Sequence, residues 1–346
     1  MKSSENSYRE YFNKVKSNWD KIAKPLDSLG KLESLVAKLG AIQQTEHPVC
    51  KKSCLVVLCA DNGIVEEGIS QSDQSVTRIC AENIAAKITT AGIMASKVNC
   101  EVLTYDVGIN TSEKLPGVID RKICKGTKNF LKEPAMTKEQ MKQAISLGRQ
   151  IVSDCKGKGF NIMCVGEMGI GNTTTSAAIA ASLLKADGSV AAGRGAGLSD
   201  EGLQKKIRVI NEAIKKYDLY NQPASVVLQT VGGFDIAVMA GIYLAAKEFN
   251  MPIVLDGIIS LAAALVAERM EKGTVDYLIP SHKGQEPAVK LLCQELVLSP
   301  VIDAAMALGE GTGAVLFLGI LDTAIEVYEK SIPFSESKIK QYERFK

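Results

Sequence analysis

The chain of 346 residues is long enough to bury a large core, as one α/β domain or as a large domain with a smaller companion. Its hydrophobic fraction of 46% and charged fraction of 23% are those of a globular enzyme and exclude a disordered chain. A net charge of +2 without a concentrated basic stripe argues against nucleic acid as a partner. One or two local cations would still suffice to bind a single phosphate.

Cysteine and histidine usage limits the chemistry further. The nine cysteines are scattered and form no CxxC pair, which favours free thiols in a reducing compartment. Only two histidines occur, so a histidine-rich metal site is excluded. The polar N-terminus lacks the apolar core of a signal peptide, and the longest apolar stretch (258–267) is shorter than the roughly 20 residues that span a bilayer. We therefore expect a cytoplasmic protein that does not enter membranes.

The first 45 residues have the apolar spacing of helices. Positions three and four apart form one apolar stripe, which consists of Tyr8, Tyr11, Phe12, Val15, Trp19 and Ile22. The turn KPLDSLG (24–30) then carries Pro25 and Gly30, and an amphipathic pattern restarts in KLESLVAKLGAIQQ (31–44). We predict two helices joined by this turn.

From residue 54 the pattern changes to short apolar runs that alternate with helical segments. The predicted strands are 54–60, 100–108, 161–167, 252–257 and 275–281. The predicted helices include 75–88, 137–155, 173–184, 198–217 and 287–296. Uniformly apolar strands between helices indicate a doubly wound α/β fold, with a mostly parallel sheet covered on both faces. We predict an N-terminal helical segment (1–48), a Rossmann-like catalytic domain (49–315), and C-terminal helices (316–346) that pack with the N-terminal segment.

Four acidic residues each adjoin a short apolar run and a glycine. They are Asp61, Glu167, Asp256 and Glu310, the last in LGEGTGA (308–314). The ends of parallel strands line one crevice, which is where such folds bind ligands. A carboxylate there has a role or costs stability, because burial without a partner is expensive. Acceptance of backbone N–H bonds at a turn explains Asp61 and Asp256 equally well, and Mg²⁺ binding is a further alternative without a DxD cluster to support it.

Two glycine-rich loops precede helices. In GEMGIGNTTTSAA (166–178) the glycines allow close approach of backbone amides, and the helix N-terminus favours phosphate. A tight turn with a threonine cap is the alternative. The loop GRGAG (193–197) is a second candidate phosphate contact or a flexible connection, and Lys206 in the next helix either reaches the phosphate or lies on a solvated face. Neither loop has the spacing of a dinucleotide fingerprint or a Walker A motif.

Two further segments contain polar residues beside apolar runs. In VGGFDIAVMAG (231–241), helix capping accounts for Asp235. In IPSHKGQEP (279–287), His282 lacks an evident acid or nucleophile partner, so we expect it to be a polar loop residue. No GxSxG elbow supports a Ser/His/Asp triad.

Taken together, these segments resemble the nicotinate-nucleotide–dimethylbenzimidazole phosphoribosyltransferases. The blocks DNGIVEEGIS, GEMGIGNTTT, GGFDIAVMAG, PIVLDGIIS, IPSHKG and LGEGTGA occur in that family's order, and KPLDSLGKLE is similar to its KPxGSLGxLE element. The resemblance extends from about Lys24 to the mid-320s. Two positions depart from it: Asn62 stands where members commonly have histidine, and Asp27 where they have glycine.

The resemblance implies a reaction and a set of site residues. Nicotinate mononucleotide and a benzimidazole-type base would give the α-ribotide 5′-phosphate and nicotinate, with Glu310 as the general base and Glu167 as an auxiliary base or support. Phosphate and ribose would be held by Gly171, Asn172, Thr173, Thr174, Gly195, Gly197, Ser281 and Lys206. The base would contact Ser72, Leu308, Asp61 and Asp256. The scheme needs no metal and no cofactor, and the family implies a homodimer with sites near the interface.

Two other functions stay open at the level of sequence. A Mg²⁺-dependent phosphotransferase or sugar-phosphate hydrolase would use the strand-end aspartates and would be sensitive to EDTA. A sensing module would bind a mononucleotide without turnover, and a change at Glu310 would leave its binding intact. Within the transferase family, the sequence does not rank dimethylbenzimidazole, other benzimidazoles, adenine and phenolic compounds as acceptors.

Overall fold

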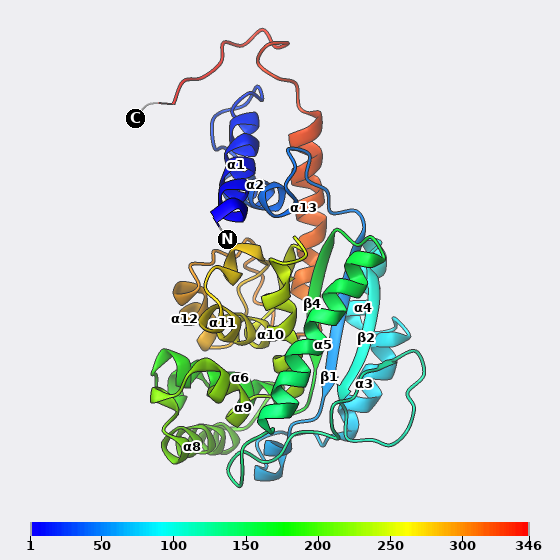
Figure 1. Ribbon diagram of the computed structural model, residues 1–346, viewed down its shortest axis with the longest axis vertical. Helices are drawn as coiled ribbons and strands as arrows, with labels where there is room; N and C mark the ends of the chain where they lie inside the picture. The colour runs from blue at the N-terminus through cyan, green and yellow to red at the C-terminus, as the bar shows by residue number, and fades with distance from the viewer. Residues whose placement is uncertain (1, 345–346) are drawn as a thin grey trace.

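A six-stranded sheet in which every pair of neighbours is parallel lies at the centre of the molecule (Figure 1). The computed structural model describes residues 2–344, so Met1, Phe345 and Lys346 of the predicted terminal segments lie outside the described residues. The strands are β1 (Ser53–Ala60), β2 (Glu101–Gly108), β3 (Ile119–Asp120), β4 (Ile162–Met168), β5 (Ile253–Leu255) and β6 (Leu278–Pro280). Their order is β3-β2-β1-β4-β5-β6.

The strand order identifies where a ligand crevice can form. Every residue of β1 is buried, and β4 is buried except for its last residue, as expected for strands with helices on both faces. The order reverses direction between β1 and β4, the switch point of a doubly wound sheet. Ligands of such folds bind beyond the carboxyl ends of the strands at this point.

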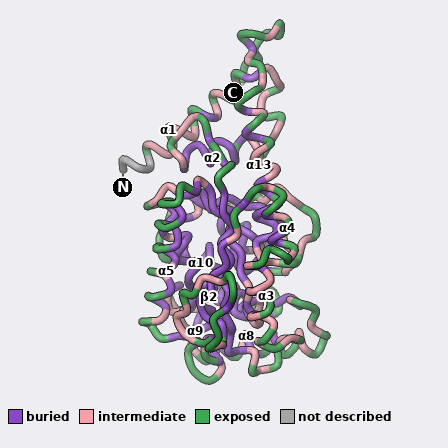
Figure 2. Tube along the Cα trace, turned by 90° about the vertical axis from the view of Figure 1, so that its right-hand side faces the viewer, coloured by how far each residue is buried: buried purple, intermediate pink, exposed green. Residues whose placement is uncertain are grey.

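Helices cover both faces of the sheet, which confirms the predicted doubly wound fold. One layer contains α5 (Lys138–Gly157), α10 (Phe234–Ala246) and α11 (Ile258–Met270). The opposite layer contains α3 (Ser75–Ala85), α4 (Thr90–Lys97) and α13 (Thr312–Lys330). Figure 2 shows the sheet edge-on between α5 and α10 on one side and α3 and α4 on the other, with the buried residues concentrated between the layers.

The remaining helices lie around the carboxyl ends of the strands and at the sheet edge. They are η1 (Gly63–Glu67), α6 (Asn172–Leu184), α7 (Gly188–Ala191), α8 (Asp200–Tyr217), η2 (Leu219–Asn221), α9 (Ala224–Val231), η3 (Thr274–Tyr277) and α12 (Ala288–Glu295). Two predicted strands, 252–257 and 275–281, were too long, since the first is a strand only over Ile253–Leu255. Residues 274–277 form a 3₁₀ turn that follows Gly273, whose φ of 86° starts the turn, and only Leu278–Pro280 pairs with β5.

The N-terminal helices pack beside α13, at one end of the molecule (Figure 1). They are α1 (Lys2–Trp19) and α2 (Lys31–Gln43), as the apolar spacing predicted. Close to the turn between them lies Glu33, a fully buried carboxylate that receives hydrogen bonds from Lys24 Nζ at 2.5 Å and from the Leu29 backbone at 3.1 Å. This pairing explains why a charged residue is tolerated inside the KPLDSLGKLE element.

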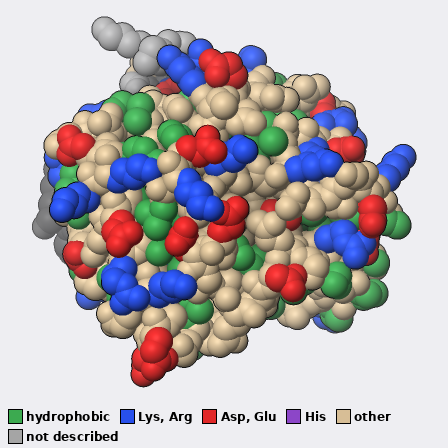
Figure 3. All heavy atoms as spheres, turned by 90° about the horizontal axis from the view of Figure 1, so that it is seen from below, with side chains coloured by type: hydrophobic (Ala, Val, Ile, Leu, Met, Phe, Trp, Pro, Cys, Tyr) green, Lys and Arg blue, Asp and Glu red, His purple; other side chains and the backbone are tan. Residues whose placement is uncertain are grey.

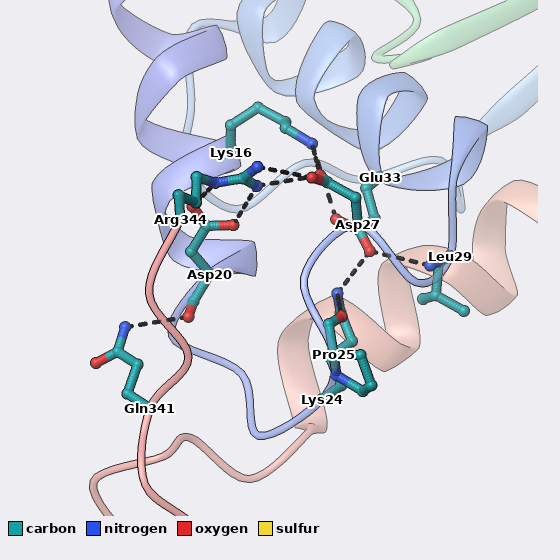
Figure 4. A network of polar contacts seen from close by, with 9 residues as sticks. All are labelled: Lys16, Asp20, Lys24, Pro25, Asp27, Leu29, Glu33, Gln341 and Arg344. Carbon is teal, nitrogen blue, oxygen red and sulfur yellow. Dashed lines mark hydrogen bonds and ion pairs between the residues drawn. The ribbon is translucent and has the colours of Figure 1, made fainter. Parts of the chain in front are cut away.

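Asp27, where the related family has glycine, keeps the backbone geometry of a glycine. Its φ is 53°, in the left-handed region. Its carboxylate accepts hydrogen bonds from Lys16 Nζ at 2.9 Å and from Arg344 Nη1 at 2.6 Å (Figure 4). Arg344 also binds Asp20 and is the main cause of the low pKa of Asp27. The aspartate therefore ties the C-terminal tail to the turn between α1 and α2.

The division into a catalytic body and a small helical body stays a proposal. Helix α13 runs unbroken across the predicted boundary at 315/316. It packs against β4 and β5 as well as against α2 and α4. The two bodies therefore share one continuous helix, and Figure 1 shows α13 extending from the sheet to the N-terminal helices.

The surface has no field of a single charge on the face seen in Figure 3, where Lys and Arg side chains alternate with Asp and Glu. This mixture agrees with the net charge of +2. Within residues 2–344, no helix has the length and apolarity needed to cross a bilayer.

Candidate active site

A pocket of about 340 Å³ opens at the carboxyl ends of the central strands. Its walls come from residues 69–72, 165–173, 256–260 and 306–310, and from parts of 194–198 and 282–289. These segments follow β1, β4, β5 and β6 or precede α13. The pocket therefore lies at the predicted switch point of the sheet. It includes three of the four strand-end acids, Glu167, Asp256 and Glu310.

Glu310 is held in a backbone conformation that disfavours a side chain. Its φ is 59°, between Gly309 at 89° and Gly311 at 81°. A non-glycine residue in the left-handed region costs free energy, and such strain concentrates at functional sites. The backbone of Glu310 also packs directly on Gly166 of β4, where an added Cβ would lie 2.5 Å from the Glu310 carbonyl carbon. A small residue at 166 is thus needed for Glu310 to reach the pocket.

Asp256 holds the loop that contains Glu310 (308–311) through backbone hydrogen bonds. Its Oδ2 accepts a hydrogen bond from the Gly311 N–H at 3.0 Å, and its Oδ1 accepts one from the Gly313 N–H at 2.9 Å. These are orphan donors at the start of α13, where a carboxylate also meets the positive end of the helix dipole. The alternative that Asp256 accepts backbone N–H bonds at a turn is therefore confirmed, and Asp256 acts on the position of Glu310.

Glu167, at the end of β4, is buried next to a second carboxylate. Asn172 Nδ2 donates to Glu167 Oε2 and also to Asp235 Oδ2, the latter at 3.0 Å, and so bridges the two acids. Burial raises the pKa of Glu167 to about 8, with a further contribution from Asp235, while the Asn172 hydrogen bond opposes the shift. Burial also raises the pKa of Asp235 to about 6. Glu167 is therefore largely protonated at neutral pH.

This protonation predicts how stability depends on pH. The pKa of Glu167 is about 8 in the folded protein against 4.5 for an exposed glutamate, so the folded state binds the proton more tightly. The contribution of Glu167 to the free energy of unfolding is therefore fully present below pH 4.5. It is lost as pH rises from there through about 8, and the free energy of unfolding falls by up to roughly 1.4 kcal/mol per pH unit. Glu167→Gln should remove this part of the slope. Urea unfolding between pH 5 and 8 measures it, and parallel curves for the two proteins would contradict the assignment.

Glu310 is less deeply buried than Glu167 and keeps one side open to the pocket. Burial is the largest cause of its raised pKa, followed by the charge of Asp256. Its Oε2 is buried without a hydrogen-bond partner, while hydrogen bonds from the Thr89 side chain and the Ala91 backbone to the carboxylate oppose the rise in its pKa. The charge of Glu310 in turn raises the pKa of Cys80, in the pocket wall on α3, after burial as the main cause. A carboxylate in this state is suited to accept a proton from a ligand.

An apolar wall lies beside Glu310. Leu308 lines the pocket two residues before Glu310, and Val76, Ile69, Val165 and Ser72 line the same pocket. Leu308 is 56% exposed, so that a flat apolar ligand would cover it. Aromatic ligands need such walls and few polar contacts.

A buried cation lies behind Thr173 of the pocket wall. Lys206, on α8, has no exposed surface, and its Nζ donates to Thr173 Oγ1 at 3.0 Å and to the Gly193 carbonyl at 2.9 Å. Burial lowers its pKa to about 8. Thr173 stands in the first turn of α6, whose N-terminus follows Gly171 with φ of 95°. Lys206, Thr173 and the start of α6 are therefore the candidate anion site.

His282 differs from the prediction. It is not a polar loop residue without partners, because its side chain is only 5% exposed and lines the pocket. Its Nδ1 lies 3.0 Å from Ser281 Oγ and 3.8 Å from Asp256 Oδ1. Ser281 donates its proton to the Leu255 carbonyl at 2.6 Å. Serine and aspartate thus approach the same ring nitrogen, so these residues are not arranged as a Ser/His/Asp triad.

Comparison of the sequence with known proteins identifies the family of this chain. A family model described as Phosphoribosyltransferase matches residues 5–339. A nicotinate-nucleotide–dimethylbenzimidazole phosphoribosyltransferase from Acetivibrio thermocellus is 40% identical over 345 residues, covering 99% of this chain and 98% of that protein. A protein of the same name from Clostridium perfringens is 39% identical over 326 residues, covering 94% of this chain and 90% of the relative. The chain belongs to this phosphoribosyltransferase family.

Solved structures agree with this assignment. The crystal structure of CobT from Thermus thermophilus superposes with a TM-score of 0.91 at 34% identity, over 96% of this chain and 100% of that one. A second structure from the same organism, named as a nicotinate-nucleotide–dimethylbenzimidazole phosphoribosyltransferase, gives a TM-score of 0.88 at 34% identity, over 94% and 97% of the two chains.

Most predicted site residues of this phosphoribosyltransferase line one pocket. They are Glu310, Glu167, Asp256, Ser72, Leu308, Gly171, Asn172, Thr173 and Gly195. Lys206 and Ser281 lie one residue layer behind, in contact with Thr173 and His282. Asn172 is engaged with two carboxylates, so its side-chain amide is not free for phosphate.

Three predicted residues lie away from the pocket wall. Asp61 is buried beyond the end of β1, where its Oδ2 accepts the Asn110 N–H at 2.7 Å. The side chain of Thr174 is fully buried, and Gly197 lies in the 194–198 loop, where its carbonyl accepts a hydrogen bond from Gln71. Asn62 is also buried, with Nδ2 directed to the Ile170 carbonyl at 3.4 Å, and does not line the pocket.

Sequence reasoning missed three pocket residues or their supports. Asp235 was explained as a helix cap, but it is fully buried in the carboxylate pair with Glu167. Arg194 and Glu286 line the pocket from two loops and were not selected, because surface loops commonly carry such residues. Their placement depends on long-range contacts that no local pattern encodes. Among residues 2–344, no three His, Cys, Asp or Glu side chains converge as a metal site.

Proposed function

We propose that the protein transfers the phosphoribosyl group of nicotinate mononucleotide to a benzimidazole-type base. The azole nitrogen attacks C1′ of the ribose on the face opposite nicotinate, so the C1′–N bond to the pyridinium breaks as the new C1′–N bond forms. The bonding electrons neutralise the departing pyridinium, which needs no acid. The proton on the azole's other nitrogen passes to Glu310. The products are the α-ribotide 5′-phosphate, nicotinate and a proton.

The observation that carries this proposal is a carboxylate with a raised pKa that lines the same pocket as Leu308 and Thr173. Glu310 offers an unpartnered Oε2 beside Leu308. Lys206, Thr173 and the N-terminus of α6 supply donors for the 5′-phosphate. A pocket polarised in this way orients a phosphorylated ribose with its C1′ toward Glu310.

Glu167 serves a different purpose from Glu310 in this scheme. A carboxyl with a pKa of about 8 carries its proton at neutral pH and is a hydrogen-bond donor. We assign it to the support of ribose and base, with Asn172 and Asp235 fixing its orientation. Glu310 then carries the general-base role alone.

Nicotinate release from nicotinate mononucleotide in the presence of EDTA tests the activity. Release that requires the azole supports transfer, because hydrolysis would proceed without it. Release that stops with EDTA and returns with Mg²⁺ would favour the metal-dependent phosphotransferase or hydrolase instead. A panel of dimethylbenzimidazole, benzimidazole, adenine and a phenol then ranks the acceptors.

We also propose a homodimer in the cytoplasm. Exposed apolar side chains occur on α3, α4 and α13 and on two loops, and α4 contacts both of the other helices; they are Ile79, Ile93 and Leu316 on the helices and Ile88 and Leu308 on the loops. An apolar surface of this kind commonly marks an interface. The nine cysteines are unpaired, which suits a reducing compartment. Light scattering at micromolar concentration tests the dimer, and a monomeric mass would contradict it.

A further inference from the structure

A carboxylate reaches the glycine-rich loop beside the candidate anion site in this structure. Glu286 precedes α12 and extends into the 193–197 loop, where its Oε1 accepts the Gly195 N–H at 3.2 Å. Gly195 packs against Thr173, one of the Lys206 partners, and Gly193 offers its carbonyl to the same lysine. Glu286 therefore occupies one donor of the proposed phosphate position, the Gly195 N–H, and its charge raises the pKa of Lys206 against the larger effect of burial.

The fit around Glu286 is close. A Cβ added at Gly193 would lie 1.6 Å from Glu286 Oε2, so only glycine leaves room for the carboxylate there. That same oxygen is buried without a hydrogen-bond partner. A buried carboxylate oxygen without a hydrogen-bond donor costs free energy. Glu286 is therefore bound in the loop through Oε1 but lacks a donor for Oε2.

A phosphate monoester would compete directly with this carboxylate. Two anions sharing one set of donors repel each other, and the repulsion is strong where water is excluded. A phosphate carries a charge of about −1.5 to −2 and three acceptor oxygens, whereas a carboxylate carries −1 and two. The phosphate is therefore the stronger ligand for the Gly195 N–H that Glu286 occupies.

We propose that Glu286 occupies the phosphate subsite of the ligand-free protein and is displaced when the 5′-phosphate of the nucleotide binds. This inference rests on the phosphate subsite of the proposed transferase. Glu286 thus sets the affinity for the phosphorylated donor, because binding requires its departure. The apparent dissociation constant equals the intrinsic constant divided by the fraction of protein in which the subsite is empty.

The displacement also has a path to the catalytic loop. The segment that leads to Glu286 is hydrogen-bonded to the segment that leads to Glu310: the Lys283 N–H donates to the Ile302 carbonyl at 2.8 Å, and the Gln285 N–H to the Met306 carbonyl at 3.2 Å. Movement of Glu286 therefore acts on residues 302–306, just before Leu308. Occupancy of the phosphate subsite and the shape of the base pocket are linked by these contacts.

Calorimetric binding of three ligands to three proteins tests the proposal. The ligands are nicotinate mononucleotide, ribose 5-phosphate and nicotinate riboside, which lacks the phosphate; the proteins are the parent, Glu286→Ala and Gly193→Ala. Glu286→Ala removes the carboxylate, and Gly193→Ala expels it by steric overlap. Both should lower the dissociation constant of the two phosphorylated ligands about tenfold. The riboside constant should not change.

Asp303→Asn is the matched control. It removes one negative charge from an exposed side chain that pairs with Lys283 in the same loop, at 3.3 Å, and leaves Glu286 in place. We expect parent-like binding. Unchanged or weaker phosphate binding in Glu286→Ala, or an equal gain for the riboside, would overturn the proposal. Tighter ribose 5-phosphate binding without any azole-dependent nicotinate release would leave Glu286 assigned and reject the transferase.

Discussion

Glu310→Gln is expected to lower the turnover of azole-dependent nicotinate release by roughly 10²–10⁴-fold, the range for a lost general base. The amide has nearly the same shape and cannot accept the azole proton. Glu310 also lies outside the anion site, so nicotinate mononucleotide should bind the variant with an affinity close to that of the parent protein. Steady-state turnover and calorimetric binding, measured on the same preparation, separate these two effects.

The pH profile of the parent enzyme gives a second view of Glu310. Burial raises the pKa of its carboxyl, and a base must be ionised to act. Turnover should therefore rise with pH through this raised pKa, and the rise should be absent in the glutamine variant. Glu326→Gln is the matched control, because Glu326 lies on the exposed side of α13 and forms an ion pair with Lys330. Near-normal turnover in Glu310→Gln would remove Glu310 from its role.

Lys206→Met is expected to lower kcat/KM for nicotinate mononucleotide by roughly 30- to 5,000-fold, because truncating one member of a buried charge pair, here the ammonium and the bound phosphate, costs about 2–5 kcal/mol. Methionine preserves most of the apolar stem but removes a fully buried ammonium. The loss should concentrate in binding, and nicotinate riboside should bind both proteins equally because it carries no phosphate.

Lys205→Met controls for the general effect of removing a charge from α8. Lys205 is the neighbour of Lys206 in sequence and is exposed. Its replacement should leave kcat/KM within about twofold of the parent value, as for most surface substitutions. Because burial lowers the pKa of Lys206 to about 8, the parent enzyme should also lose affinity for the nucleotide above that pH. Equal effects of the two substitutions would contradict the anion-site assignment.

The sequence predicted the fold and the acid-bearing strand ends because both follow from local patterns. The uniformly apolar runs at 54–60 and 161–167 indicated strands covered on both faces, and they became β1 and β4. The glycine pattern around Glu310 indicated an unusual backbone, and three successive positive φ values were found there. The resemblance to the family supplied the roles that these patterns do not encode.

What could not be predicted depends on contacts between distant segments. Asp61 and Asp256 follow the same kind of strand, yet Asp256 reaches the pocket and Asp61 does not. The sequence indicated no partner for His282. Strands β5 and β6 are neighbours in the sheet, so Asp256, which follows β5, lies beside His282, which follows β6. Helix α11 is buried along most of its length and so lacked the polar face that reveals a helix in sequence. The hydrogen bond between Glu286 and the Gly195 N–H joins segments that are 91 residues apart, so no local pattern predicted it.

The anomeric configuration of the product is the most direct test of the account. Purified protein is incubated with nicotinate mononucleotide, dimethylbenzimidazole and EDTA, and the products are separated and measured by NMR. We predict one α-linked ribotide 5′-phosphate for each nicotinate released, because the azole attacks C1′ opposite the leaving group with Glu310 as its base. A β-linked ribotide, or nicotinate released with free ribose 5-phosphate, would contradict direct displacement in this pocket.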